Sequence, residues 1–225
     1  MAGGPPPLPL IPYPAWLGQP VGQPAPAPAL GTGGTGTPGS ATNPLTMAQA
    51  EALFAEMAAV PYIPFNFPDD GCYARAHEMC RLMQDKGVDC GKAWNYGNDF
   101  ENGTSTLKVT TPYHPSGSVG WRYHVAPMVY VQDSAGHAAR MVIDPSVAKG
   151  PIDALEWKDL QTDTKSRLEF SEATAYYKTP DALADGTKLT PYVEKDDDHS
   201  KTKSILAEKS GERDERKKLY PDLFK

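Results

Sequence analysis

Two helical patterns followed by a series of strand patterns predict an α+β fold for the chain after residue 45. Apolar residues recur with helical spacing over 46–59 and 72–86, and residues 121–144 are rich in aromatic and β-branched side chains. A length of 225 residues and a hydrophobic share of 40% suffice for one domain of ordinary size with additional segments.

Residues 1–45 differ in composition from the rest of the chain. They hold 12 prolines and 9 glycines, no charged residue, and no sustained period of 2 or 3.6 residues. This composition predicts a flexible arm or linker rather than a packed unit. Because prolines interrupt every apolar run in the arm, a Sec-type signal peptide is not predicted.

The helices are predicted from capping residues as well as from periodicity. The first covers 46–59, where the initial threonine would cap it. The second covers 72–86, and Asp69 or Asp70 would cap it. Cys72 then lies in the first turn of this second helix.

Strand patterns occupy most of the chain after residue 91. Short strands are predicted at 92–96 and 106–111, and turn-forming residues between 121–132 and 138–144 predict a hairpin. The pattern weakens beyond residue 151, with one further strand expected at 175–178. Trp121 and Tyr123, in the first hairpin strand, are placed on the strand face opposite His124 and in the core.

The register of this hairpin decides whether a histidine and a carboxylate meet. If the loop is the three residues 133–135, paired residue numbers sum to 268 and His124 lies directly opposite Asp144. A two-residue loop would instead place His124 opposite Pro145. The first register makes a hydrogen bond between His124 and Asp144 geometrically easy.

Cys72, His124 and Asp144 provide the three groups of a thiol catalytic triad. A cysteine hydrolase needs a thiolate, which a helix N-terminus stabilises, a histidine that moves protons, and a carboxylate that orients the histidine. Taken singly, each residue has a structural interpretation: Cys72 as a small buried hydrophobe, and the other two as ordinary strand residues.

The remaining cysteines and histidines do not indicate a metal or cofactor. Three cysteines cannot form a disulfide framework, although one bond between Cys80 and Cys90 is an alternative. The five histidines are dispersed and no C-x-x-C pair is present, so neither a metal site nor a cofactor is expected. His77 lies about 140° around the helix from Cys72 and is expected to make a local hydrogen bond.

Whole segments of the chain resemble bacterial protein-glutaminase, a family of protein-glutamine deamidases that includes secreted enzymes and toxin domains. The resemblance covers residues 63–177, about half the chain. It is carried by FPDDGCYARAHEM at 67–79, GVDCGKAWNYGN at 87–98, WRYHVAPMV at 121–129 and VIDPSVAKGP at 142–151. It implies an α+β fold related to the papain and transglutaminase group, with the nucleophile helix packed on an antiparallel sheet. It also assigns Cys72 as nucleophile, His124 as general base and acid, and Asp144 as orienting carboxylate.

The activity implied by the resemblance is conversion of protein-bound glutamine to glutamate, with release of ammonia through a cysteine thioester. Three alternatives remain open. A transglutaminase resolves the same thioester with a lysine amine, and a cysteine protease cleaves the backbone. A catalytically silent binding module would keep the fold without the chemistry.

The organisation follows from these assignments. Residues 1–45 form the arm, 46–193 the catalytic domain, and 194–225 a charged C-terminal segment, predicted as a solvated helix or a partly disordered tail. If helical, this segment is expected to belong to the same domain.

The expected partner is a protein substrate with an exposed glutamine, and an immunity, chaperone or adaptor protein is a further candidate. The net charge of −6 lies after residue 50 and provides no basic footprint for nucleic acid. No stretch is long and apolar enough to predict a membrane span.

The predicted location rests on two differences from the family. Its secreted enzymes are rich in disulfides and carry a pro-segment unlike residues 1–45. Both differences favour an effector or toxin that is secreted without a Sec-type signal and delivered into the cytoplasm of a target cell.

Overall fold

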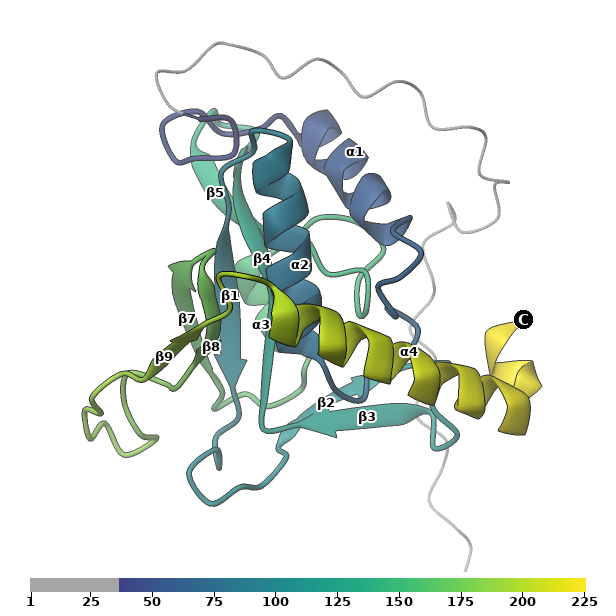
Figure 1. Cartoon of the computed structure of the whole chain (residues 1–225). Helices are drawn as coiled ribbons and strands as arrows, with labels where there is room; N and C mark the ends of the chain where they lie inside the picture. The colour runs from purple at the N-terminus through teal and green to yellow at the C-terminus, as the bar shows by residue number, and fades with distance from the viewer. Residues whose placement is uncertain (1–36) are drawn as a thin grey trace, which may run out of the picture.

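The computed structural model describes residues 37–225, so that residues 1–36, most of the predicted arm, lie outside it. Helices and antiparallel strands mix, as predicted (Figure 1). In chain order the elements are α1 Met47–Ala58, α2 Cys72–Asp85, β1 Gly91–Tyr96, β2 Leu107–Thr110, β3 Ser118–Trp121, β4 Tyr123–Gln132, β5 Ala138–Val142, β6 Ile152–Asp153, α3 Ala154–Asp159, β7 Arg167–Glu172, β8 Ala175–Lys178, β9 Val193–Lys195, α4 Ser200–Leu219 and a final 3-10 turn, Pro221–Phe224.

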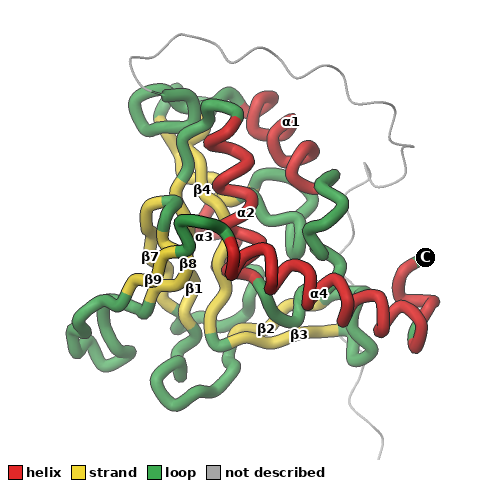
Figure 2. The backbone as a smooth tube through the Cα atoms, in the orientation of Figure 1, coloured by secondary structure: helices red, strands yellow, loops and turns green. Residues whose placement is uncertain are grey.

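A five-stranded antiparallel sheet in the order β6-β5-β4-β1-β7 forms the centre of the fold (Figure 2). Strands β2 and β3 pair separately, as do β8 and β9. Helices α1 and α2 share one hydrophobic cluster with β4 and β5, whereas Trp157 of α3 belongs to another cluster with β1 and β4. The central strands therefore carry helices on both faces.

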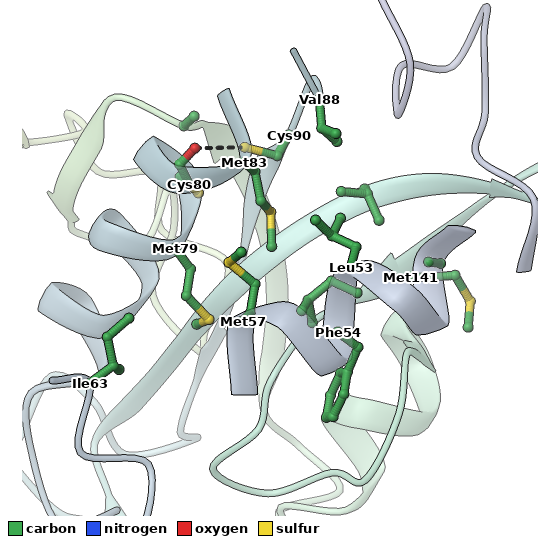
Figure 3. Close-up of a cluster of buried hydrophobic side chains, with 14 of the residues drawn as sticks. Leu53, Phe54, Met57, Ile63, Met79, Cys80, Met83, Val88, Cys90 and Met141 are labelled. Atoms are coloured by element: carbon green, nitrogen blue, oxygen red, sulfur yellow. Dashed lines mark hydrogen bonds between the residues drawn. The ribbon is translucent and has the colours of Figure 1, made fainter. Parts of the chain in front are cut away.

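The larger core lies between α1, α2 and the sheet. Figure 3 shows Leu53 and Met57 of α1 directed toward Met79 and Met83 of α2. All four side chains are buried. Burial of an apolar side chain of this size contributes about 1.5–3 kcal/mol, so this contact fixes α1 against α2.

The two predicted helices are present, with one correction. Thr46 caps α1 as predicted, in a reciprocal capping box with Gln49. Neither Asp69 nor Asp70 caps α2, because its N-cap is Gly71 in the left-handed conformation, with φ of 79° and no side-chain cap. A left-handed N-cap suits glycine, which has no Cβ.

The predicted register of the β4–β5 hairpin is wrong by two residues. Paired residues sum to 270, as in Gln132 with Ala138, so the loop has five residues instead of three. The reason is the side chain of Asp133, which accepts hydrogen bonds from the backbone N–H groups of Ala135 and His137 and closes a longer loop. His124 is therefore not directly opposite Asp144.

The predicted strand over 121–132 is interrupted at Arg122. Before this bend, Trp121 ends β3 and pairs with β2, and after it Tyr123 begins β4 and pairs with β1. Side chains alternate between the two faces of a sheet only along an unbroken strand, and here the strand changes its pairing strand at Arg122. Placing Trp121 on the face opposite His124 is consequently wrong, although its side chain is buried as expected.

The ends of the chain add to the fold. Leu45 is buried and exchanges two backbone hydrogen bonds with β4, so the packed part begins before residue 46. The charged C-terminal segment forms the 20-residue helix α4, the first of its two predicted alternatives. It packs on α2 and buries Thr202, Leu206 and Lys209. Sequence patterns do not predict β6, α3, β7 or β9.

Among residues 37–225, no helix combines the length and the apolar character that a membrane span requires.

We predict that Thr46→Ala lowers the free energy of unfolding by about 1 kcal/mol, because it removes the acceptor of the capping box at the start of α1. Chemical denaturation measures the change. Thr164→Ala, at an exposed threonine, is the control and should change stability little. Equal effects of the two substitutions would contradict a specific role of the cap.

Candidate active site

Cys72 is the first residue of α2, so its thiol lies at the helix N-terminus, near backbone N–H groups. Its N-cap, Gly71, offers no side chain, so no side chain caps the first N–H groups of the helix. Those groups and the positive end of the helix dipole attract negative charge and can stabilise an oxyanion. The Cys72 side chain is nearly enclosed, with the residue 5% exposed.

His124 and Asp144 are hydrogen-bonded, as the sequence predicts, even though the register differs. Nε2 of His124 lies 2.8 Å from Oδ2 of Asp144, and the residues are only 1% and 2% exposed. The Ile143 N–H donates to the Pro127 carbonyl, so the pairing in which residue numbers sum to 270 continues past the end of β5. Asp144 then falls opposite Ala126, diagonal to His124 and on the same face.

Two tryptophans hold the His124 ring between them. The Trp121 ring stacks on it with a centroid separation of 4.3 Å and an interplanar angle of 10°. The Trp157 ring lies 5.5 Å away at 26°. Because both rings restrict rotation of the imidazole, its nitrogen atoms keep fixed directions toward their partners.

The Asp144 carboxylate is held by three donors from different segments. Besides His124, Nε1 of Trp157 donates at 2.9 Å and the backbone N–H of Ser146 at 3.0 Å. Burial would raise the pKa of this carboxyl, but the charge of His124, these side-chain hydrogen bonds and the charge of Arg75 hold it below its ordinary value. Asp144 is therefore expected to be a carboxylate at neutral pH.

His124 is expected to be an imidazolium at neutral pH. Burial would lower its pKa, but the adjacent Asp144 carboxylate raises it to about 9, with a smaller contribution from Cys72. The imidazole thus lies between the carboxylate and the thiol. With Nε2 directed to Asp144, Nδ1 is the nitrogen available to Cys72, and it is buried with no hydrogen-bond partner among residues 37–225.

A surface pocket of about 650 Å³ is lined by residues next in sequence to two of these residues. Its walls include the neighbours in sequence of the thiol and the imidazole, Tyr73 and Tyr123. The further lining residues are Tyr176, Tyr177, Glu194, Ser200, Lys201, Ser204 and Ile205. Strands β8 and β9 and helix α4 therefore form the outer wall of a space next to the candidate nucleophile.

Several residues of the site are not predicted from sequence. Trp157 lies in an unpredicted helix, and Trp121 is assigned to the wrong face. Asn95 pairs directly with His124 across β1 and β4, is fully buried, and finds no partner for either amide atom within residues 37–225. Arg75 is buried one helical turn after Cys72. Of these residues, Arg75 alone has a sequence signal for the site: it follows Cys72 by three residues on a predicted helix and therefore lies on the same helix face.

The other histidine and cysteines of α2 have structural surroundings. His77 contacts Nζ of Lys92 at 3.0 Å and the Asp196 carbonyl at 3.3 Å, so its hydrogen bonds join distant segments rather than local ones. Burial and the Lys92 charge lower the pKa of His77 to about 4. Cys80 and Cys90 are free thiols, and the alternative of a disulfide between them is wrong. The Cys90 thiol instead contacts the Cys80 carbonyl (Figure 3).

Within the described part of the chain, no group of three or more histidine, cysteine, aspartate or glutamate side chains is arranged to hold a metal ion.

Comparison with known proteins identifies similar sequences and structures. A family model described as glutaminase matches residues 50–161, a span that contains Cys72, His124 and Asp144. The chain is similar to a crystal structure of protein-glutaminase, at 28% identity and a TM-score of 0.54, over 72% of this chain and 85% of that one. A search of curated proteins found no match.

Two further solved structures are similar over a comparable share of the chain. One is the NMR structure of protein-glutaminase from Chryseobacterium proteolyticum, with 28% identity and a TM-score of 0.58, over 74% of this chain and 88% of that one. The other is a crystal structure of pro-protein-glutaminase, with 28% identity and a TM-score of 0.54, over 73% of this chain and 59% of that one.

The ion pair predicts how stability depends on pH. The raised pKa of His124 stabilises the fold fully below the ordinary histidine value of 6.5, and this contribution is lost as pH rises through about 9. The lowered pKa of Asp144 stabilises the fold above the ordinary value of 3.8, and that contribution is lost in acid as pH falls through the folded pKa.

We predict that Asp144→Asn lowers the pKa of His124 from about 9 by about one to three units, because the carboxylate that raises it is removed. Titration of the labelled His124 ring by NMR measures the change. Turnover should also fall, on the order of 10⁴-fold as in other triads that lose this carboxylate. Asp185→Asn, in an exposed turn, is the control. An unchanged His124 titration would contradict the ion pair.

Proposed function

The chain belongs to the protein-glutaminase family, and from that premise we propose that it converts protein-bound glutamine to glutamate through a thioester on Cys72. It is a cysteine-dependent hydrolase of side-chain amides with a papain/transglutaminase-like fold. The observation that best supports the catalytic roles is the 2.8 Å contact between buried His124 and Asp144, beside a cysteine at an uncapped helix start.

In the first half of the reaction, Sγ of Cys72 attacks the carboxamide carbon of a substrate glutamine. The oxyanion that forms is held by backbone N–H groups at the start of α2. His124 donates its proton to the leaving nitrogen, the carbon–nitrogen bond breaks, and ammonia departs. Asp144 keeps the imidazolium oriented throughout. The product is a thioester between Cys72 and the substrate side chain.

In the second half, His124 accepts a proton from water, and the water oxygen attacks the thioester carbon. The carbon–sulfur bond breaks, and the thiolate and imidazolium are restored. The substrate side chain leaves as glutamate, so its protein loses an amide donor group and gains a negative charge. Such a charge at a partner's binding surface is enough to disrupt its contacts.

The tyrosine-lined pocket supports a macromolecular substrate. Its volume of about 650 Å³ is far larger than one glutamine side chain, and its lining residues Tyr73 and Tyr123 directly follow Cys72 and directly precede His124 in sequence. We propose that residues flanking the target glutamine lie in this pocket. An immunity or adaptor protein that covers the same opening would block access to the thiol.

We further propose that the enzyme acts as an effector or toxin in the cytoplasm of a target cell. Three free cysteines support this proposal, because the fold needs no disulfide and thus no oxidising compartment.

We predict that the purified protein releases ammonia from casein and converts its glutamines to glutamates without cutting the backbone. Cys72→Ala should abolish both signals, because it removes the nucleophile, whereas Cys80→Ala should keep them. Ammonia detection together with peptide mass spectrometry measures the reaction. Cross-linked peptides would indicate a transglutaminase, cut backbones a protease, and full activity of Cys72→Ala would contradict the assigned nucleophile.

We predict that production in the cytoplasm of a susceptible cell slows growth and leaves glutamate at specific glutamine positions in host proteins. The Cys72→Ala variant should do neither, since the damage depends on the chemistry. Growth curves and mass spectrometry of the host proteins are the measurements, with protein levels matched by immunoblotting. Equal toxicity of Cys72→Ala would instead support a silent binding module.

A further inference from the structure

Arg75 is a buried cation that the reaction scheme leaves without a role. It follows Cys72 by three residues on α2, so the two side chains are neighbours on the helix surface. The residue is 2% exposed. Placing a guanidinium in the interior is unfavourable unless anions or hydrogen-bond acceptors surround it, so its surroundings must explain its presence.

The guanidinium holds the loop that enters the nucleophile helix. Its Nη1 donates to the Asp70 carbonyl at 2.6 Å and to the Phe67 carbonyl at 3.2 Å. Its Nη2 is also buried and has no partner within the described chain. Since the loop ends at Gly71, directly before Cys72, the two bonds help to fix the direction in which the thiol is presented.

The charged groups that act on Arg75 lie in the loop before α2, at the first residue of α2 and in the turn after β5. Burial lowers the pKa of Arg75, and four anionic groups oppose that effect, namely those of Cys72, Asp144, Asp70 and Asp69. The two loop carboxylates have other cationic partners on α4. Arg216 pairs with Asp69, and Lys209 pairs with Asp70.

Unlike Asp69 and Asp70, Cys72 and Asp144 form no ion pair with a cation of α4. In its ion-pair form the triad holds a Cys72 thiolate, a His124 imidazolium and an Asp144 carboxylate, which together carry one negative charge. Arg75 brings the buried site to neutrality. In the thioester state His124 is neutral and Asp144 is still a carboxylate, so the same cation again balances the site.

We propose that Arg75 is a positioning residue of this reaction, whose positive charge balances the triad anions and whose hydrogen bonds fix the loop before Cys72. This role rests on the proposed function of the triad. Without the cation, the buried site would carry a net negative charge, which is relieved when the thiolate takes up a proton. Loss of the charge should therefore raise the pH at which the thiolate forms.

The test measures the thiolate itself and needs no substrate. The rate of Cys72 alkylation by iodoacetamide is followed from acid to alkaline pH by mass spectrometry of the Cys72 peptide, in wild type, Arg75→Gln and Arg75→Lys. A failed deamidation assay would leave this measurement intact, so the two proposals fail independently. Arg81→Gln is the control, because Arg81 also lies on α2 but pairs with Glu78 and Asp85.

In wild type, the rate of Cys72 alkylation rises with pH along the acid limb of the rate–pH curve. The expected result is that Arg75→Gln shifts this acid limb by about one to three pH units toward alkaline pH. Arg75→Lys should keep the limb near its wild-type position because the charge remains, while its turnover falls because the two-carbonyl hydrogen bonding is lost. An acid limb that is unchanged in folded Arg75→Gln would overturn the proposal.

A double variant covers the case in which Arg75→Gln does not fold. Asp144→Asn removes the carboxylate that Arg75 balances, so Arg75→Gln/Asp144→Asn should regain a cooperative thermal transition that Arg75→Gln lacks. Asp144→Asn alone is measured beside it. A double variant that remains unfolded would mean that Arg75 serves only to hold the loop, and it would overturn the charge-balancing role.

Discussion

The buried carboxylate of Asp144 is the constraint on which the candidate site depends. A carboxylate in the interior must be fully hydrogen-bonded, and its three donors come from β4, α3 and the turn after β5. These contacts join α3 on one face of the sheet to the strand that carries His124. His124 and Trp157 both donate to Oδ2 and Ser146 donates to Oδ1. Removing any of these donors would weaken the compensation of a buried charge, so the carboxylate specifies the relative position of the segments as well as the orientation of the imidazole.

The contact between His124 and Asp144 is predictable from sequence although the register is not. Side chains alternate along a strand with a period of two, so an error of one residue would place Asp144 on the wrong face, whereas the actual difference of two keeps the face. The carboxylate then lies diagonal to His124 instead of directly opposite. The five-residue loop depends on hydrogen bonds of the Asp133 side chain, which residue spacing alone does not reveal.

The parts of the site that sequence reasoning misses depend on contacts between distant segments. Trp121 stacks on His124 because the strand changes partner at Arg122, which ends the alternation expected for an unbroken strand. Trp157 reaches Asp144 from a six-residue helix, α3, too short for a helical period to be recognised. By contrast, α1, α2 and most central strands have clear local patterns, and those elements are where they were expected.

Hydrogen bonds connect the charged C-terminal helix, α4, to the loop that precedes Cys72, even though the sequence of this helix indicates only a solvated surface. Arg216 makes two hydrogen bonds to Asp69, in the loop directly before Cys72. The backbone of the same loop accepts hydrogen bonds from Arg75 and from Trp121, which also stacks on His124. The loop therefore connects α4 to Cys72, the candidate nucleophile, and to the imidazole of His124, and a change in how α4 packs would alter the surroundings of both side chains.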